Sequence, residues 1–288
     1  MNVAHAPGEL ERRPRAVAIG TFDGVHAGHR AVVQAALAAG DTPTVVTFDP
    51  HPREVLGYRV AGLATLERRL ELLAELGVED TLVVEFTPAV AELPPAEFAR
   101  EYLIAIGAKQ VIAGETFRFG HRRSGDFALL EELGLNPQIV PLVEGVSSSQ
   151  IRHLIGAGDV RAAAPLLGRP VTVEGLVVTG DARGGTLGFP TANLRADPAL
   201  VVPAHGIYAG MARGRRAAVS IGVNPHYGGA EQRIETFLLD FEGDLYGERL
   251  VVELWDRLRD EAVFESEAEL VAQIARDVEA TRAAVSPC

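Results

Sequence analysis

The sequence predicts two domains: an N-terminal α/β domain built on an open parallel sheet, and a C-terminal small antiparallel β-barrel that ends in a helix. The chain has 288 residues, which is long for one average domain and short for three. Short apolar runs alternate with helical stretches in the first half, whereas β-rich segments follow one another without helices in the second half.

Short apolar runs in the first half have the length and composition of buried strands. They are Ala16–Ile19, Thr44–Phe48, Thr81–Glu85, Gln110–Ala113 and Gln138–Leu142. Leucines at positions 66, 70, 73 and 76 recur at helical spacing, and residues 96–106 form a second expected helix after Pro94-Pro95. Strands that alternate with helices build a parallel sheet. The first fifteen residues contain no apolar block, and we expect a short disordered arm there.

The pattern of expected secondary structure changes after Gly168-Arg169-Pro170, from strands that alternate with helices to strands that follow one another. The expected strands of this half are Val171–Val178, Ile207–Ala212, Ala217–Ile221, Ile234–Phe241 and Arg249–Leu254. Closely spaced strands with Gly and Pro between them are typical of a small antiparallel barrel. A late helix from Glu265 to about Thr281 places apolar residues on one face, which we expect to pack against the barrel. We therefore expect domains at residues 14–160 and 165–288.

Composition narrows the classes of function. The chain is 47% apolar and 23% charged, and no run approaches the length of a membrane span, so we expect no membrane helix. The net charge is −12 without a dense basic stripe, which argues against a nucleic-acid partner. Lys109, the only lysine, does not lie in a phosphate-binding P-loop. Cys288 is the only cysteine, so no intrachain disulfide can form, and a cytoplasmic location fits.

The segment Gly20–His29 follows the first expected strand and opens onto a helix near Arg30. Open α/β sheets bind ligands at this position, between a strand end and a helix N-terminus. Gly28 allows a phosphate to approach the backbone, and His26 and His29 can donate hydrogen bonds to charge that develops on phosphate oxygens. Two histidines near a turn also fit a surface pair or a zinc site. A zinc site needs a further ligand, and no cysteine or HExxH pattern supplies one.

Several blocks of the first half together resemble the bacterial bifunctional riboflavin kinase/FAD synthetase family, whose N-terminal half is an HxGH nucleotidyltransferase. They are Gly20–His29, Thr47–Pro52, Gly114–Gly120 followed by Arg123 and Gly125, and Ser147–Arg152. The resemblance implies a Rossmann-like domain that transfers the adenylyl group of ATP to FMN.

By this resemblance His26 and His29 stabilise the transition state of that transfer. ATP would be bound by Gly20, Phe22, Asp23, Gly28, Ser148 and Arg152. The flavin and nucleotide loops would contain His51, Thr116, Phe117 and Arg118. A helix N-terminus at Ser148 suits an anion on independent grounds, although Ser147–Ser149 also fits a simple N-cap, and His51 between two prolines also fits an ordered loop residue.

One residue departs from the family pattern. The family shows Asn or Asp where this chain has Thr116. A hydroxyl on a short stem makes fewer contacts than an amide or a carboxylate. The departure leaves open a protein whose adenylyltransferase half is impaired or altered in specificity.

The most informative segment of the second half is Gly180–Asn193. Its glycines permit close backbone approach and amide nests that hold phosphates. Thr191 and Asn193 offer oxygen ligands beside this loop, and Mg²⁺ prefers such oxygens together with nucleotide phosphates. A glycine-rich loop by itself also fits a hairpin turn, but the Pro190-Thr191-Ala192-Asn193 box makes that interpretation improbable.

This segment resembles the riboflavin kinase signature, and Pro203–Tyr208, Ile221–Pro225, Asp244–Gly247 and Leu258–Phe264 continue the match. The resemblance implies that ATP binds at Gly180, Gly185, Gly188, Pro190, Thr191 and Asn193, with Thr191 and Asn193 as the Mg²⁺ ligands. It makes Glu235 the general base for the terminal hydroxyl of riboflavin. Phe264, Trp255 and Leu258 are candidates for an apolar flavin slot.

The sequence thus predicts an enzyme that phosphorylates riboflavin to FMN and adenylylates FMN to FAD with pyrophosphate release. Its partners are riboflavin, FMN and ATP, and its cofactor is Mg²⁺. The alternatives are a riboflavin kinase with an impaired nucleotidyltransferase domain and a flavin-binding regulator without turnover. The sequence does not predict an oligomeric state.

Overall fold

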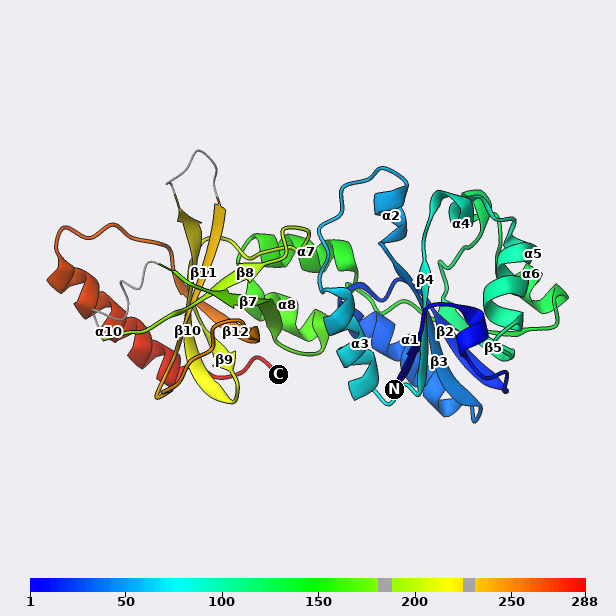
Figure 1. Cartoon of the computed structure of the whole chain (residues 1–288), viewed down its shortest axis with the longest axis horizontal. Helices are drawn as coiled ribbons and strands as arrows, with labels where there is room; N and C mark the ends of the chain where they lie inside the picture. Colours follow the sequence, from blue (N-terminus) through cyan, green and yellow to red (C-terminus); the bar gives the residue numbers. More distant parts are fainter. Residues whose placement is uncertain (181–187, 225–230) are drawn as a thin grey trace. The chain divides into compact units, whose positions relative to one another are not determined.

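The computed structural model describes residues 1–180, 188–224 and 231–288, without the side chains of 224, 231 and 232. The chain forms two compact units, Met1–Ser148 and Ser149–Cys288 (Figure 1). Each unit has its own sheet, a parallel one in the first and a closed antiparallel one in the second. The predicted fold class is confirmed.

The sheet of the first unit has the strand order β1-β4-β3-β2-β5-β6, and each neighbouring pair is parallel. The strands are β1 (Asn2–Ala4), β2 (Arg15–Ile19), β3 (Thr42–Asp49), β4 (Asp80–Glu85), β5 (Ala108–Gly114) and β6 (Asn136–Val140). Each predicted apolar run lies in a strand, except that β6 ends at Val140 and leaves Leu142 outside.

The expectation of a disordered N-terminal arm is wrong. Residues Asn2–Ala4 form β1 on the edge of β4, and Pro7–Glu9 form a short 3₁₀ helix, η1. Ala4 is 1% exposed and Leu10 is 5% exposed, because both join the apolar cluster under the sheet. The segment is too short to show a periodic pattern, and its order comes from the open edge of β4.

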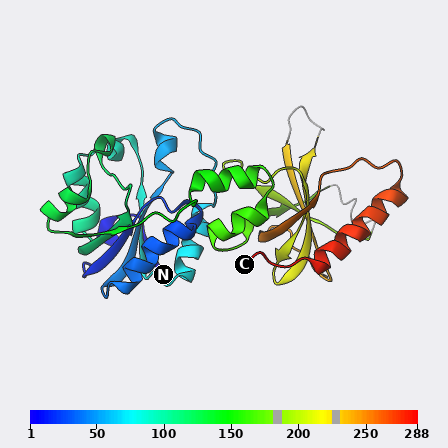
Figure 2. The same ribbon diagram turned by 180° about the vertical axis from the view of Figure 1, so that it is seen from behind.

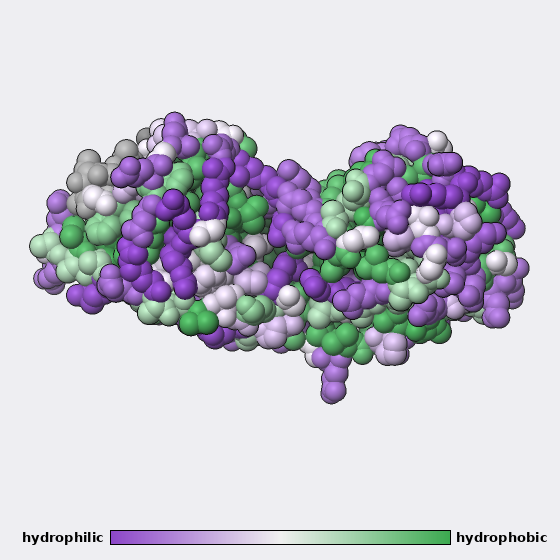
Figure 3. Space-filling view, turned by 90° about the horizontal axis from the view of Figure 1, so that it is seen from below, coloured by the Kyte–Doolittle hydropathy of each residue, from purple (hydrophilic) through white to green (hydrophobic). Residues whose placement is uncertain are grey.

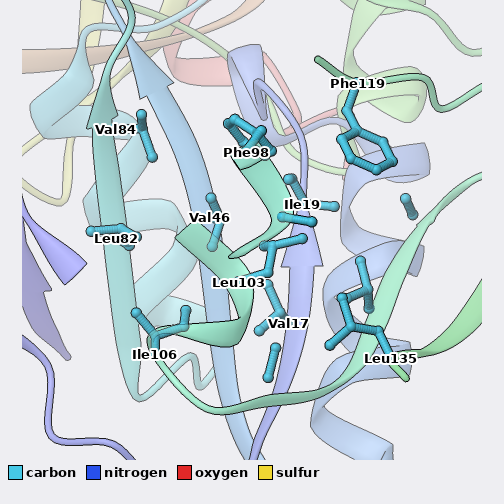
Figure 4. Close-up of a cluster of buried hydrophobic side chains, with 14 of the residues drawn as sticks. Val17, Ile19, Val46, Leu82, Val84, Phe98, Leu103, Ile106, Phe119 and Leu135 are labelled. Atoms are coloured by element: carbon cyan, nitrogen blue, oxygen red, sulfur yellow. The ribbon is translucent and has the colours of Figure 1, made fainter. Parts of the chain in front are cut away.

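Helices cover both faces of this sheet. They include α1 (Ala27–Ala38), α2 (Pro52–Val55), α3 (Leu66–Glu75), α4 (Pro88–Glu92), α5 (Pro95–Phe98) and α6 (Phe127–Glu132). Val32, Val33, Leu72 and Leu73 of α1 and α3 pack on one face, where α1 lies across the strands (Figure 2). Phe98, Leu103, Ile106 and Leu130 pack on the other face (Figure 4).

The second predicted helix, residues 96–106, is only partly α-helical. After α5 the chain continues as a π-helical segment, η3 (Ala99–Ile104). Ala99 and Leu103 are fully buried in this segment. Such π-helical segments are rare and occur mostly as single turns within α-helices.

The strand order reverses at β2, which lies between β3 and β5. The chain proceeds from β2 to β3 and β4 on one side, and from β5 to β6 on the other. Parallel sheets bind ligands at the carboxyl ends of the strands at such a switch point. The loops after β2 and β5 therefore frame the predicted nucleotide site.

The second unit contains a closed barrel with the order β10-β11-β8-β7-β12-β9, and β9 pairs with β10 to close it. The strands are β7 (Val171–Val178), β8 (Ala192–Ala196), β9 (Gly206–Ala212), β10 (Arg215–Asn224), β11 (Glu231–Leu238) and β12 (Arg249–Arg259). Sequence reasoning missed β8, which is short and follows the glycine-rich segment in the sequence. It also extended β11 to Phe241, although Asp240, with φ of 56°, turns the chain before that residue.

Helices α7 (Ser148–Gly156) and α8 (Val160–Leu167) precede the barrel, and α10 (Glu267–Ala283) follows it. The helix α8 contacts β7 and β12, and α10 contacts β9 and β10 (Figure 1). The hydroxyl of Ser266 accepts a hydrogen bond from the N–H of Glu269 at 3.2 Å, which is why α10 begins two residues later than predicted.

Among the described residues, no helix is long and apolar enough to cross a membrane. Hydrophilic and hydrophobic side chains are interspersed over the face of each unit that Figure 3 shows.

Candidate active sites

The loop after β2 is a tight turn that carries the two histidines. Phe22 and Val25 have left-handed backbone, with φ of 50° and 41°. The carboxylate of Asp23 accepts a hydrogen bond from the N–H of Leu63 at 2.7 Å, so it anchors the turn to a distant loop. Phe22 and Asp23 are buried, whereas Gly20 is half-buried. Asp23 therefore holds the loop from within.

His26 and His29 lie together at the N-terminus of α1. Their rings stack with centroids 3.6 Å apart and an interplanar angle of 13°. His26 caps the helix, since its Nδ1 accepts a hydrogen bond from the N–H of His29 at 3.3 Å. Phe22 packs edge-on against His29 with ring centroids 5.3 Å apart. The two histidines thus form one fixed unit.

Gly28 is required where the histidine pair meets the backbone. A Cβ atom at this position would lie 3.3 Å from the Cε1 atom of His26. A larger residue would therefore displace the imidazole of His26 by a few tenths of an ångström, in addition to restricting the approach of a phosphate.

The pKa of His29 lies well below its ordinary value. Desolvation is the largest cause, and the positive charges of His26 and Arg69 add to it. His29 is consequently neutral at pH 7. Its Nδ1 atom is buried and has no hydrogen-bond partner among the described residues. The orientation of the ring is therefore fixed by its contacts with His26 and Phe22 and not by a hydrogen bond to Nδ1.

Sequence reasoning missed Arg69 of α3. This arginine is 6% exposed and donates from Nη1 to the carbonyl of Thr21 at 2.8 Å. Its Nη2 donates to Asp49 at the end of β3 at 3.2 Å. A signal was available, because Arg69 shares the buried helical stripe with residues 72, 73 and 76, where an apolar residue is expected.

The loop after β5 contains the predicted flavin and nucleotide residues. Thr116 and Arg118 are exposed, and the Thr116 carbonyl accepts a hydrogen bond from Arg123 at 3.4 Å. Phe117 stacks on Phe119 with ring centroids 5.5 Å apart. Since β5 pairs with β2, this loop and the histidine loop leave the same edge of the sheet.

His51 follows β3 and caps α2, because its Nδ1 accepts a hydrogen bond from the N–H of Arg53 at 3.1 Å. Ser148 and Arg152 stand at the first and fifth positions of α7, one helical turn apart, and both are half-buried. The division of the chain lies between Ser148 and Ser149, so Arg152 belongs to the second compact unit.

The barrel register brings the predicted kinase residues together. Asn193 of β8 lies directly opposite Glu235 of β11, and Ser220 of β10 lies opposite Glu235 on the other side. Residues opposite one another in antiparallel strands point to the same face, with Cβ atoms about 5 Å apart. Ile234 and Thr236 on either side of Glu235 are buried, so Glu235 faces outward.

Gly180 lies against Asn193. A Cβ atom at position 180 would overlap the Asn193 amide, at 2.6 Å from its Oδ1 atom. Thr191 is half-buried just before β8, and Gly188 and Pro190 are exposed. Gly185 and Pro225 lie outside the described residues.

The carboxylate of Glu235 pairs with the guanidinium of Arg233, two residues earlier on β11. Both side chains are half-buried, with exposed fractions of 23% for Glu235 and 32% for Arg233. This ion pair holds the carboxylate in one orientation on the same face as Asn193.

The candidates for an apolar flavin slot differ in their surroundings. Trp255 is 3% exposed, donates from Nε1 to Glu253 at 2.8 Å and lies under Arg216. Leu258 and Phe264 are half-buried, and Arg259 lies over the Phe264 ring. A cavity of about 410 Å³ in this unit is lined by residues 157–161, 256, 257, 259 and 260, and it includes none of the predicted kinase residues.

Within the described ranges, no group of three His, Cys, Asp or Glu side chains could hold a metal ion. Neutral oxygens from Thr191 and Asn193 are a weak donor set by themselves. They become adequate when phosphate oxygens complete the coordination, as Mg²⁺ prefers.

Comparisons with known proteins agree with this two-site arrangement. The family model described as FAD synthetase matches residues 9–151, and the one described as riboflavin kinase matches residues 167–285. The bifunctional riboflavin kinase/FMN adenylyltransferase of Listeria monocytogenes is 36% identical over 93% of this chain and 92% of its own. The protein of the same name from Escherichia coli K12 is 38% identical over 90% and 89%.

A crystal structure of a protein described as a macrolide-efflux protein from Streptococcus pneumoniae is also similar, with a TM-score of 0.87 and 33% identity. The match covers 97% of this chain and 98% of that chain. The identities and coverage of the curated relatives, together with the two domain matches, show that this chain belongs to the family of bifunctional riboflavin kinase/FMN adenylyltransferases.

Proposed function

We propose that the second unit transfers the γ-phosphoryl group of ATP to riboflavin, and that the first unit transfers the adenylyl group of ATP to the resulting FMN. The products are FAD and pyrophosphate. The observation that carries the kinase half is the register of the barrel, which sets Glu235 opposite Asn193 and Asn193 against Gly180. The stacked pair of His26 and His29 carries the other half.

In the kinase reaction Glu235 accepts the proton of the terminal ribityl hydroxyl as that oxygen attacks the γ-phosphorus. Arg233 orients the carboxylate until substrate binds. Thr191 and Asn193 would hold Mg²⁺ together with the phosphates, and the ion would neutralise charge on them. The glycine-rich loop before β8 would bind the phosphates through backbone amides.

In the adenylyl transfer an FMN phosphate oxygen attacks the α-phosphorus of ATP and pyrophosphate leaves. No covalent intermediate with the protein forms. His26 and His29 donate hydrogen bonds to the oxygens on which negative charge develops, and a neutral His29 keeps one ring N–H as a donor. Gly20, Phe22, Asp23 and Gly28 shape the loop that binds ATP, and Ser148 and Arg152 contact its phosphates.

The remaining proposals concern the residues that bind FMN and the cellular location of the protein. His51, Thr116, Phe117 and Arg118 lie on loops at the carboxyl edge of the sheet, and we assign them to FMN and nucleotide binding. A cytoplasmic location is supported by the single cysteine, Cys288, which excludes an intrachain disulfide.

A second candidate function is a riboflavin kinase whose adenylyltransferase unit is slow. The exposed Thr116 favours it, because its hydroxyl reaches a shorter distance than the Asn or Asp that the resemblance leads us to expect.

The test is chromatography of the flavins formed over time from riboflavin and MgATP. We expect FMN first and FAD later. Glu235→Gln keeps the shape of the side chain but removes its basicity, so FMN formation should fall by about 10²–10⁴ while added FMN is still adenylylated. His29→Ala should do the reverse. If the wild-type protein forms FMN but no FAD, the second candidate replaces the first, and if it forms neither, both are wrong.

A further inference from the structure

Arg69 is a buried cation directly behind the histidine loop. It occupies the fourth position of α3 and is 6% exposed. Its Nη1 donates to the carbonyl of Thr21, the residue that begins the turn after β2, at 2.8 Å. Thr47 of β3 donates to the same carbonyl at 3.0 Å. The start of the loop is therefore held by two donors, Arg69 of α3 and Thr47 of β3.

The loop needs such restraint, since its backbone is in an unfavourable conformation. Phe22 and the β-branched Val25 both have left-handed φ values, of 50° and 41°. Non-glycine residues keep this conformation where surrounding contacts over-determine it. The restraints are the Arg69–Thr21 hydrogen bond at one end and the Asp23–Leu63 hydrogen bond in the middle. The stack of His26 and His29 follows directly.

The positive charge of Arg69 is buried in the protein. Its ion-pair partner Asp49 is 46% exposed and 3.2 Å away, so solvent screens part of the countercharge. The Nε atom of Arg69 is buried without a partner among the described residues. Burial lowers the pKa of Arg69, and Asp49 and Asp23 oppose this effect. The positive charges that act on His29 are those of His26 and Arg69, and both lower its pKa.

We propose that Arg69 is a positioning residue of the adenylyl transfer site: through its hydrogen bond to Thr21 it fixes the loop that carries the histidine pair. Its positive charge adds to the desolvation that keeps His29 neutral. This inference rests on the proposed adenylyl transfer. A neutral His29 still has one ring N–H that can donate to a phosphate oxygen. It forms no ion pair with the phosphates of the products, so it does not slow their release. The charge of Arg69 acts through His29, and no contact of Arg69 with substrate is implied.

The neighbouring Arg68 supplies a matched control. Arg68 lies on the same helix and pairs with Glu71 at 2.8 Å and Glu75 at 3.2 Å. Arg68→Met therefore removes the same side chain from the same helix without touching Thr21 or Asp49. A purely structural role of arginine in α3 predicts similar effects for both variants.

The experiment compares Arg69→Met, Arg69→Lys and Arg68→Met in the full chain. We expect Arg69→Met to lower kcat for FMN adenylylation by about 10- to 100-fold, because small displacements of catalytic groups have effects of this size. Kinase turnover by the same preparation should stay unchanged, because Glu235 lies in the other compact unit, and thermal unfolding of the variant reports whether the first unit is folded. Arg68→Met should leave both activities within about twofold of wild type, because the half-buried Arg68 pairs with Glu71 and Glu75 of its own helix and not with the histidine loop.

The pH dependence separates charge from geometry. Loss of the nearby positive charge makes protonation of His29 easier, so its pKa rises and the acidic limb of the kcat profile moves to higher pH in Arg69→Met. Arg69→Lys restores the charge but not the paired donors, so the limb should return toward the wild-type position while kcat recovers only in part.

Proton NMR titration of the His29 ring, assigned by comparison with His29→Ala, gives a readout that needs no activity. If wild type forms no FAD, the proposed function fails, yet a higher His29 pKa in Arg69→Met would still support the electrostatic part of the inference. Arg69→Met with unchanged kcat and unchanged titration would overturn it. A loss of FMN adenylylation that comes with a lower melting temperature, no change in titration and no rescue by Arg69→Lys would reduce Arg69 to a structural residue.

Discussion

Asn193 has little room around it, because Glu235 lies across the strand pair and Gly180 lies against its amide. Any side chain at position 180 must displace the amide. We predict that Gly180→Ala lowers kcat/KM of the kinase by about 10- to 100-fold, since a ligand of the phosphate-bound ion moves. FMN adenylylation should be unaffected. The flavin assay on both reactions measures this.

Gly156→Ala is the matched control, because nothing lies within 4 Å of a Cβ atom at that position of α7. It should leave kinase turnover unchanged. Wild-type kinase activity in Gly180→Ala would show that the position of the Asn193 amide does not matter for the reaction.

Thr116 carries a second prediction at this scale. Its side chain is exposed on the loop after β5, at the edge where the histidine loop also ends. Thr116→Asn should raise FMN adenylylation efficiency by up to about tenfold, the value of one neutral hydrogen bond of about 0.5–1.5 kcal/mol. Thr116→Val keeps the shape without the hydroxyl and should lower it. Equal efficiencies in all three proteins would mean that this side chain does not meet the ligand.

At the scale of elements, a buried ion pair joins the amino ends of β2 and β4. Arg15 is 1% exposed, pairs with the Asp80 carboxylate and donates to the Thr44 hydroxyl at 2.9 Å. Arg13 donates to Asp80 at 2.7 Å. Burial by itself raises the pKa of Asp80, but the hydrogen bonds and charges of Arg13 and Arg15 outweigh it, so the pKa lies below its ordinary value.

We predict that Asp80→Asn destabilises the first unit by about 3–5 kcal/mol, because it leaves Arg15 buried without a countercharge. A depressed folded pKa stabilises the protein above the unfolded pKa of about 3.9, and this stability is lost as the pH falls through the folded value. Urea unfolding between about pH 3 and 7 should therefore show less acid dependence in Asp80→Asn. Glu79→Gln, at a 58% exposed position, is the control and should change little. An acid dependence identical to wild type would contradict the prediction.

At the scale of the whole molecule, the two activities are proposed to lie on separable parts. The sequence suggests functional boundaries of 14–160 and 165–288, whereas the compact units meet at Ser148 and Ser149. The helix α8 (Val160–Leu167) runs across the expected gap between residues 160 and 165, with Val160 fully buried and Asp159 accepting a hydrogen bond from the N–H of Ala162 at 3.0 Å. The helix packs on β7 and β12 of the barrel.

We predict that a fragment of residues 149–288 folds and converts riboflavin to FMN. A fragment of residues 162–288 should be less stable by at least about 2–4 kcal/mol, because it lacks the buried Val160 and the Asp159 cap in addition to α7. Thermal unfolding and the flavin assay compare the two. Equal melting temperatures would show that α7 and the start of α8 add nothing to the barrel, and an unfolded longer fragment would show that the units are not independent.

The local features of this protein could be predicted from its sequence. Apolar runs and helical spacing predicted the parallel sheet and the barrel, because the periodicity of a strand or a helix is visible within a short stretch of sequence. The order of the motifs around His26, Thr116, Thr191 and Glu235 predicted the family, since each motif is a short segment that can be recognised without a fold. The pairing of the Gly180–Asn193 segment with Glu235 followed from the resemblance and not from spacing.

Tertiary structure decided what depends on long-range contact. The strands β1 and β8 are short and lack a pattern, and each forms because a partner edge is open beside it. The sequence places Arg69 on the apolar stripe of α3, but only the packing of α3 against the sheet brings it against Thr21 and near His29. The cross-strand register that sets Asn193 opposite Glu235 is likewise a property of barrel closure, because pairing between strands distant in sequence is fixed by the packing of the whole barrel and not by local propensity.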